Sequence, residues 1–170
     1  MSVSSFKEFV ANRKTETDEV RSIDWESRKV WYLKQVEELF KKIRGYLAEF
    51  KDDIQVTEGT ETISEDFIGE YEVPILKINL YGKHASVVPA GINLIGTPGR
   101  VDLVSYVERV RIILGDKNRR SPASIYRNLT EEDHALTDYV WKIITESPRR
   151  QYVEVEKECF LEALQEVLGG

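Results

Sequence analysis

The sequence predicts an α+β fold. In this fold a curved or partly closed, largely antiparallel sheet of about six to eight strands has two N-terminal helices packed on it and is followed by a short C-terminal helix. The pattern of apolar residues changes twice along the chain, and this predicts the fold. They recur at helical spacing over residues 5–52, alternate with polar residues over about 54–155, and return to helical spacing over about 157–168. Strands and helices do not alternate along the chain, which disfavours a parallel doubly wound sheet.

The chain of 170 residues is long enough to bury a core without a metal or a disulfide, and it fits one domain over residues 1–170. The first residues lack an apolar signal core, and no apolar run is long enough to cross a bilayer. The single cysteine, Cys159, cannot form an internal disulfide, which suits a reducing compartment. These features predict a cytoplasmic protein that does not act at a membrane.

Two helices are expected in the N-terminal part. The S-x-x-E pattern from Ser5 to Glu8 is typical of a capping box and predicts that a short helix begins there, with residues 12–19 as a connection or an extension of it. Asp24 is expected to cap the second helix, which ends near Phe50 or Lys51. We expect an apolar seam on this helix to pack on the protein's own core; its members are Leu33, Val36, Phe40, Ile43, Leu47 and Phe50.

The β-rich part is divided by glycines and prolines. Gly59 and Thr60 predict a turn, and Pro89 to Gly91 predict a bend or bulge. The expected strands cover residues 54–56, 62–72, 75–81, 85–88, 92–95, 101–105, 107–114, 139–144 and 151–155, with 101–114 alternatively forming one long bent strand. A short helical turn is expected over 123–129.

Charge is distributed unevenly along the chain, although the net charge is only −6. Residues 53–72 carry seven acids and no base, whereas residues 73–120 carry eight bases and three acids. Such blocks either form separate acidic and basic faces or mix on the folded surface. The helix at residues 24–51 and the acidic segment 53–72 are therefore the candidate surfaces for a protein partner or for self-association.

The segment after residue 98 contains the candidate catalytic residues. Gly99-Arg100-Val101-Asp102-Leu103 resembles the first half of a PD-(D/E)xK nuclease core, but Val110 stands where the second half would need a lysine after Glu108. Asp102, Glu108, Arg100 and His84 are the weak candidates for such a site. The alternative is that Arg100 and Asp102 form an ion pair on one face of a strand. Gly96 to Gly99 lacks the Lys-Ser/Thr of a phosphate loop and predicts a β-turn.

No cofactor and no metal site are expected. His84 and His134 do not have the spacing of metal ligands and are expected in solvated turns. Cys159 is expected to be a half-buried thiol, and the sequence leaves open a nucleophilic pair with either histidine.

A basic cluster with interleaved tyrosines is the candidate nucleic-acid surface. Its bases are Arg109, Arg111, Lys117, Arg119, Arg120 and Arg127. The sequence isoelectric point of about 5.1 and the absence of a recognised binding motif argue against this function.

Several segments together resemble a family of bacterial proteins to which no activity is assigned. These segments are the Trp-bearing helix, Gly69-Glu70-Tyr71-Glu72, the Pro-x-Gly segment, Ile95-Gly-Thr-Pro-Gly-Arg-Val-Asp-Leu103, Trp141-Lys-Ile143 and Phe160-Leu-Glu-Ala-Leu164. The resemblance implies a bacterial origin and a single domain.

The sequence therefore favours a non-enzymatic, cytoplasmic bacterial protein that acts by binding another protein. A nucleic-acid-binding or metal-dependent nuclease-like protein that uses the region of Arg100, Asp102 and Glu108 is the alternative. A third hypothesis is a small ligand held in a partly closed sheet.

Overall fold

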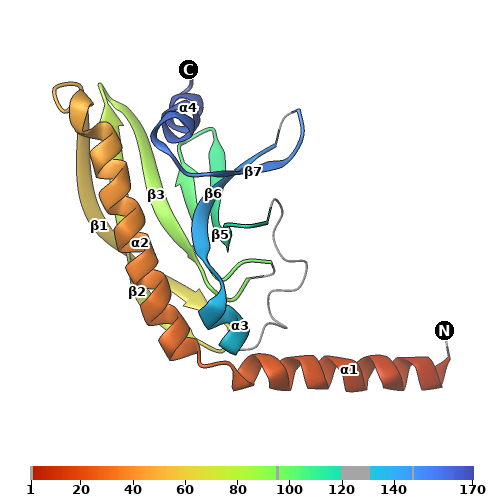
Figure 1. The fold of residues 1–170 in the computed structure, drawn as a ribbon. Helices are drawn as coiled ribbons and strands as arrows, with labels where there is room; N and C mark the ends of the chain where they lie inside the picture. The colour runs from red at the N-terminus through yellow and green to blue at the C-terminus, as the bar shows by residue number, and fades with distance from the viewer. Residues whose placement is uncertain (1, 95, 120–130, 147) are drawn as a thin grey trace.

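A computed structural model describes residues 2–94, 96–119, 131–146 and 148–170 of the chain. The helices in these residues are α1 (Val3–Ser22), α2 (Trp25–Leu47), a 3-10 turn η1 (Ala48–Phe50), α3 (Glu131–Leu136) and α4 (Lys157–Val167). The strands are β1 (Ile54–Glu65), β2 (Gly69–Leu80), β3 (Lys83–Gly91), β4 (Arg100–Val104), β5 (Arg109–Asp116), β6 (Tyr139–Thr145) and β7 (Gln151–Glu154). Figure 1 shows their arrangement.

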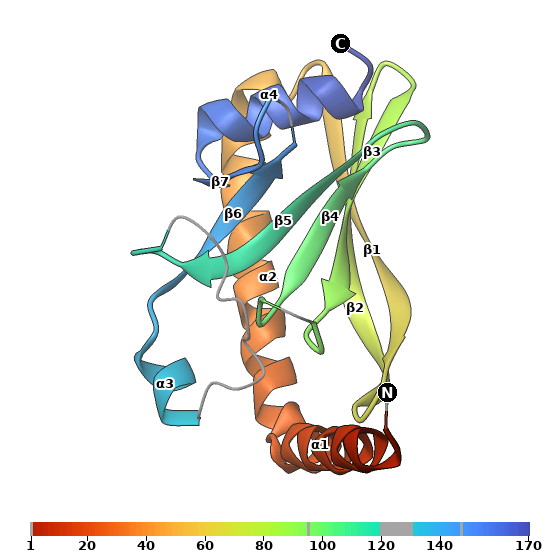
Figure 2. The ribbon, with the colours of Figure 1, turned by 90° about the vertical axis from the view of Figure 1, so that its right-hand side faces the viewer.

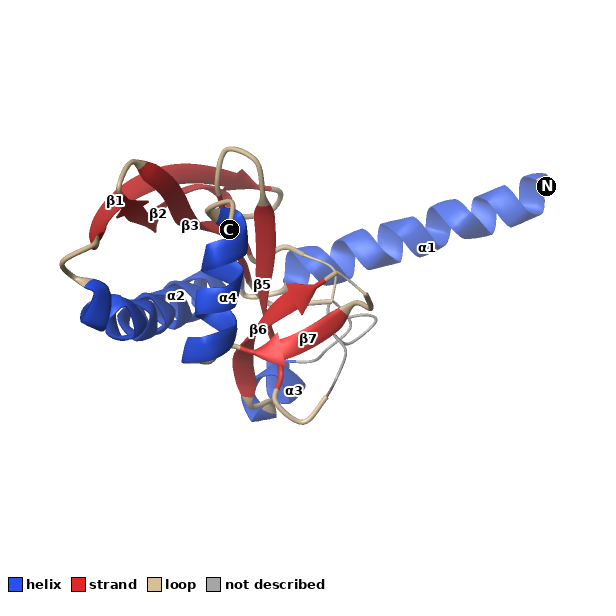
Figure 3. Cartoon of the chain, turned by 90° about the horizontal axis from the view of Figure 1, so that it is seen from above, coloured by secondary structure: helices blue, strands red, loops and turns tan. Residues whose placement is uncertain are grey.

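The seven strands form one antiparallel meander in which the spatial order is the order along the chain. The sheet is open, with β1 and β7 at its edges, and it curves around α2 (Figures 2 and 3). The predicted α+β class, the antiparallel sheet, the two N-terminal helices and the short C-terminal helix are confirmed.

Helix α2 covers the concave face of the sheet with the predicted apolar seam. Its buried members Val36, Phe40 and Ile43 belong to the same core cluster as residues of β2 to β6. Asp24 caps the helix as expected, because its carboxylate accepts a hydrogen bond from the backbone N–H of Ser27 at 3.1 Å. The apolar seam of α2 therefore packs on the protein's own core, as the sequence predicted.

Tyr32 of α2 joins this helix to the middle of the sheet. Its side chain is fully buried, and its hydroxyl donates to the carbonyl oxygen of Arg100 at 2.5 Å. Burial raises the pKa of the Tyr32 hydroxyl, so this group stays protonated and able to donate. A side chain at Gly99 would meet the Tyr32 ring, since its Cβ would lie 2.5 Å from Cδ2. Gly99 is therefore required by close packing.

A bulge at the end of β3 forms a second fixed point. The register between β3 and β4 shifts between Pro89 and Gly91, where the sequence predicted a bend. The carboxylate of Glu65 then accepts hydrogen bonds from the backbone N–H groups of Ile92 and Asn93, each at 2.8 Å, and from the hydroxyl of Tyr71 at 2.5 Å. This half-buried acid fixes the path of the chain where it leaves the sheet.

Helix α1 differs from the sequence prediction in its start and its length. Ser2, not Ser5, caps it, through a hydrogen bond from the backbone N–H of Ser5 to the hydroxyl of Ser2 at 3.1 Å. Helix continues over residues 12–19 to Ser22, so the alternative of an extension was correct.

Several predicted strand limits were wrong. Gly59 lies inside the uninterrupted strand β1, and its Cβ would approach Ile75 Cγ1 to 3.2 Å, so this glycine reflects close packing and not a turn. The predicted strand 62–72 spans the real turn between β1 and β2. Strands β4 and β5 are separate and paired, as in the prediction of strands 101–105 and 107–114, so the alternative of one long bent strand is wrong.

Two other expectations concern segments outside the regular sheet. Residues 92–94 lie beyond the end of β3, so the predicted strand 92–95 is wrong for them. The predicted helical turn 123–129 lies outside the described residues, and α3 was not expected. Within the described parts of the chain, none of the helices has the length and apolar character needed to span a membrane.

Gly91 and Gly45 provide a matched pair of variants. Gly91 has a φ of 131°, a region essentially reserved for glycine, and a Cβ there would lie 2.2 Å from Glu65 Oε1. Gly91→Ala is expected to lower the free energy of unfolding by about 1–3 kcal/mol. Gly45, inside α2, has nothing within 4 Å of its Cβ position, so Gly45→Ala should raise this free energy by about 1 kcal/mol. Urea denaturation measures both, and a loss at Gly45 that equals the loss at Gly91 would contradict the packing described here.

Candidate functional site

Asp102 lies on β4 with its side chain only 7% exposed. Its Oδ1 forms an ion pair with Arg100 Nε at 3.0 Å, and its Oδ2 accepts hydrogen bonds from Arg100 Nη2 at 3.4 Å and from Arg109 Nη1 at 3.1 Å. The strand-face pair of Arg100 and Asp102 is therefore present, with Arg109 as an additional partner. Two guanidinium groups already neutralise this carboxylate, which is the arrangement of a structural ion pair and not of an open metal site.

The other candidate catalytic residues lie elsewhere. Glu108 is exposed in the turn before β5, and its neighbour Arg109 is the residue that reaches Asp102. His84 is exposed on β3 opposite Asn79 of β2. Among the described residues, no group of three or more acidic, His or Cys side chains could hold a metal ion. The structure thus brings together Arg100 and Asp102 but not Glu108 or His84.

Cys159 lies in the first turn of α4 and lines a hollow of about 420 Å³ between α4 and strands β5 to β7. Its Sγ accepts from the backbone N–H of Glu156 at 3.1 Å and lies 3.2 Å from the carbonyl oxygen of Glu154. The described lining of this hollow includes Glu108 but neither histidine. Cys159 therefore helps to cap α4, and the described geometry does not pair it with His84 or His134.

The predicted nucleic-acid surface is only partly described, because Arg120 and Arg127 lie outside the described residues. Arg109 is paired with Asp102, and Arg119 Nε lies 3.7 Å from Asp116 Oδ2. Arg111 is exposed on β5, and Lys117 follows this strand. Two of the four described basic residues therefore form ion pairs with acids. These pairs reduce the net positive charge available to bind a phosphate backbone.

The acidic segment 53–72 contains all of β1, the connecting turn and the start of β2. The carboxylate of Glu65 accepts hydrogen bonds from the backbone at the bulge, and Glu58 forms an ion pair with Arg44 of α2 at 2.7 Å. Strand β1 is an edge of the sheet, and charged side chains along an edge discourage unwanted pairing with another chain. This placement offers a structural explanation for the acids.

Helix α1 is the feature that the sequence interpretation missed. It extends away from the rest of the protein, as Figures 1 and 3 show, and Val20 near its C-terminal end is its only buried residue. Four apolar side chains of its first half are exposed: Val3 (75%), Phe6 (53%), Phe9 (53%) and Val10 (50%). The spacing of Phe6, Phe9 and Val10 was visible in the sequence. Only the structure shows that nothing in the described chain covers them.

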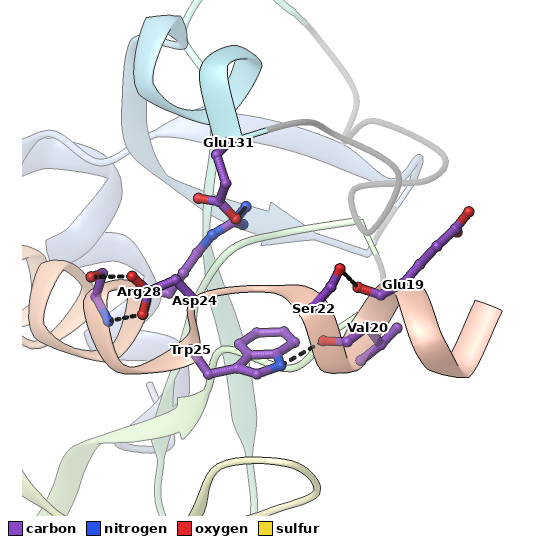
Figure 4. Close-up of polar contacts among 8 residues, drawn as sticks. Glu19, Val20, Ser22, Asp24, Trp25, Arg28 and Glu131 are labelled. Atoms are coloured by element: carbon purple, nitrogen blue, oxygen red, sulfur yellow. Dashed lines mark hydrogen bonds and ion pairs between the residues drawn. The ribbon is translucent and has the colours of Figure 1, made fainter. Parts of the chain in front are cut away.

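The junction between α1 and α2 holds α1 at a defined angle to the body. The indole of Trp25 points back to the last turn of α1, where its Nε1 donates to the carbonyl oxygen of Val20 at 2.8 Å (Figure 4). The hydroxyl of Ser22 donates to the carbonyl oxygen of Glu19 at 2.7 Å. Trp25 and Val20 both belong to the core cluster, so the base of α1 is anchored while its first half is free.

The two sides of α1 differ in charge. Val3, Phe6 and Val10 follow one another at spacings of three and four residues, and Lys7 and Lys14 lie beside them on the same side of the helix. Of the acids, Glu8 and Glu19 lie on the opposite side, whereas Glu16 lies beside Phe9 and pairs with Arg13, and Asp18 lies beside Lys14. Within the described residues, neither Lys7 nor Lys14 has an ion-pair partner. In the free first half of α1, the apolar row therefore has Lys7 beside it and Glu8 on the opposite side.

A further hollow, of about 550 Å³, lies between α2 and α3. Arg28 is 3% exposed, and its Nη2 donates to Glu131 Oε1 at 2.9 Å (Figure 4). Trp31, His134 and Tyr139 form an aromatic cluster beside it, with ring centroids 4.7 to 5.4 Å apart. His134 is thus half-buried against aromatic rings, and the prediction that it lies in a solvated turn was wrong.

Comparisons with models of protein families, with curated proteins and with solved structures find no match for this chain. The resemblance to a bacterial family, the single domain and the cytoplasmic location therefore stay predictions.

Replacing Asp102 tests its role as an ion-pair partner. Asp102→Asn leaves Arg100 and Arg109 facing an uncharged group, so we expect the free energy of unfolding to fall by about 2 kcal/mol. Glu108→Gln removes the exposed carboxylate of the other acid and should change this quantity by less than about 0.5 kcal/mol. Equal losses for the two variants in urea denaturation would contradict the structural role.

The environment of His134 predicts a dependence of stability on pH. Burial, with a smaller contribution from the positive charge of Arg28, lowers the pKa of His134 from 6.5 to about 4. As pH falls from 6.5 towards 4, the unfolded chain takes up a proton at this position and the folded chain does not, so this histidine reduces stability in that window.

Denaturation at about pH 7 and about pH 5 measures this effect. His134→Gln should lose less stability between the two pH values than the wild type does. The control is His84→Gln, since His84 is exposed on β3. If both variants behave like the wild type, the assigned environment of His134 is wrong.

Proposed function

We propose that this protein acts by binding another protein and that the free half of α1 is the binding element. The observation that supports this proposal is the exposure of Val3, Phe6, Phe9 and Val10 on a helix that packs on the body only near its C-terminal end. Most helices in proteins gain their stability from packing an apolar side. Helix α1 has such a side without a partner in the described chain.

The spacing of these side chains fits a known mode of recognition. Val3, Phe6 and Val10 occupy positions i, i+3 and i+7, which is the pattern by which an amphipathic helix inserts into a groove. Phe9 lies beside Phe6 with their ring centroids 6.0 Å apart, so the two rings present one contiguous apolar surface. An aromatic pair of this kind is suited to be the centre of an interface.

The charges of α1 favour a partner with acidic residues. Lys7 and Lys14 flank the apolar row, whereas Glu8 and Glu19 lie on the other side of the helix. A groove with an apolar floor and an acidic rim would complement this surface, and a basic rim would be repelled by it. We therefore infer a protein partner with a groove of that chemistry.

The surfaces expected from the sequence are less suitable. The apolar seam of residues 24–51 is buried in the protein's own core, and the acidic segment 53–72 has the structural explanations given above. The ion pairs of Asp102 weaken the nuclease-like alternative. Our proposal is a non-enzymatic role in a reducing, cytoplasmic environment, which suits the free thiol Cys159.

A photo-reactive phenylalanine analogue in place of Phe9 tests this proposal in the source cells. The control carries the same group in place of Val107, which is also exposed (80%) but lies in the turn between β4 and β5. We expect a cross-link to one distinct protein from position 9 alone. Equal cross-links from both positions would refute the proposal, and cross-links only to a second copy of this chain would replace the inferred partner by self-association.

Variants then measure the contribution of the apolar row to affinity. Phe6→Asp is expected to weaken binding of the cross-linked partner at least tenfold, because it removes the central ring and adds an acid to a surface that meets acids. Val107→Asp should bind as the wild type does. Lys7→Gln with Lys14→Gln should weaken binding less and reduce its dependence on salt concentration. Isothermal titration at two salt concentrations measures all three, and an unchanged affinity of Phe6→Asp would contradict the proposed role of α1.

A further inference from the structure

The end of the protein farthest from α1 has an open hollow of about 440 Å³. It lies where η1, the ends of β1 and β2, and α4 meet, beyond the C-terminal end of α2. The hollow is open to solvent and is a groove on the surface of the protein. Its volume is within the range of about 300–1,000 Å³ that is usual for small-molecule sites.

The lining of the hollow is largely apolar and comes from two sides. Ile54 and Leu80 are direct partners in the pairing of β1 with β2, and both line the hollow while only partly buried. Leu161, Leu164 and Leu168 approach from α4 and the residue after it. These positions are rigid because they belong to paired strands and to a helix that packs on the core.

Helix α4 has more apolar surface than the core covers. Phe160, Ala163 and Val167 are buried in the core cluster, and they account for the packing of the helix. Leu161 and Leu168 lie beside this row, only partly buried, and both face the hollow. An apolar ligand in the hollow would cover these side chains, and this burial would stabilise the complex.

The rim of the hollow has one free positive charge. Lys83, the first residue of β3, has no ion-pair partner among the described residues, and its Nζ would lie 4.0 Å from a Cβ at Gly169, so it reaches across to the end of α4. The acid at the rim, Asp53, already accepts a hydrogen bond from the hydroxyl of Tyr81. The amide of Gln165 is a further donor on the lining.

The geometry points to a binding site for a single-chain amphipathic carboxylate, such as a fatty acid. Its hydrocarbon chain would lie among Leu80, Leu161 and Leu168, and its carboxylate would bind the ammonium group of Lys83 at the rim. An apolar floor with a few polar groups that fix the orientation is the usual design of a small-molecule site. This inference does not depend on the binding role of α1, which lies at the other end of α2.

Binding of laurate, dodecanol and dodecylamine, all below their micelle concentrations, tests this site. These probes have the same chain and differ in the charge of the head group. We expect laurate to bind most tightly and dodecylamine most weakly. Absence of laurate binding, or a preference for dodecylamine, would overturn the inference.

Two variants distinguish the contributions of the head group and of the chain. Lys83→Gln is expected to weaken laurate binding about tenfold and to leave dodecanol binding unchanged, because only the charged hydrogen bond is lost. Lys77→Gln, which removes an exposed lysine of β2 outside the hollow, is the matched control. Leu161→Asp should abolish binding of both probes. Equal effects of Lys83→Gln and Lys77→Gln would refute the role of Lys83.

Methyl spectra of the wild-type protein make the test independent of how the variants fold. Laurate should shift the methyl signals of Leu80, Leu161 and Leu168, and it should leave those of Val3 and Val10 on α1 unchanged. Shifts confined to α1 would place laurate on the protein-binding element and overturn the assignment of the hollow.

Discussion

The packing of α2 against the concave face of the sheet is the constraint on which the rest of the structure depends. The apolar face of a sheet must be buried against another element of the fold, because its exposure to water would be unfavourable. Helix α2 covers it along its whole length, and Tyr32 joins the two layers through its buried hydroxyl and the carbonyl oxygen of Arg100. The glycine at position 99 and the bulge that ends at Gly91 follow from this contact, because the chain must pass close to the tyrosine ring and then turn around Glu65.

The two ends of α2 lie next to different exposed features of the protein. At its N-terminal end, the indole of Trp25 anchors the last turn of α1, so the first half of α1 extends from the body without a covering layer. At its C-terminal end, the sheet and α4 diverge and leave the hollow beside Lys83. A protein partner at one end and an amphipathic ligand at the other would therefore contact separate parts of the molecule. Helix α2 would lie between the two sites.

The charged groups that first suggested catalysis have structural roles. Asp102 is held between Arg100 and Arg109 on the outer part of β4 and β5, and Glu65 accepts three hydrogen bonds at the bulge. A carboxylate that is already paired with guanidinium or N–H groups stabilises one local geometry, whereas a catalytic or metal-binding carboxylate needs an open position.

The sequence by itself determined the fold class, because helical and alternating periodicity are local and survive any tertiary arrangement. The α2 seam, the Asp24 cap and the bulge at Pro89 to Gly91 could all be predicted in this way. Periodicity did not reveal that Gly59 fits against Ile75, since this depends on a neighbouring strand. It predicted strands 101–105 and 107–114 but left open one long bent strand, and only the pairing of β4 with β5 decides between them. The candidate sites were decided only by the tertiary structure. An apolar row such as Val3, Phe6 and Val10 looks the same in a sequence whether it is buried or free, and only the completed core shows that α2 is covered and α1 is not.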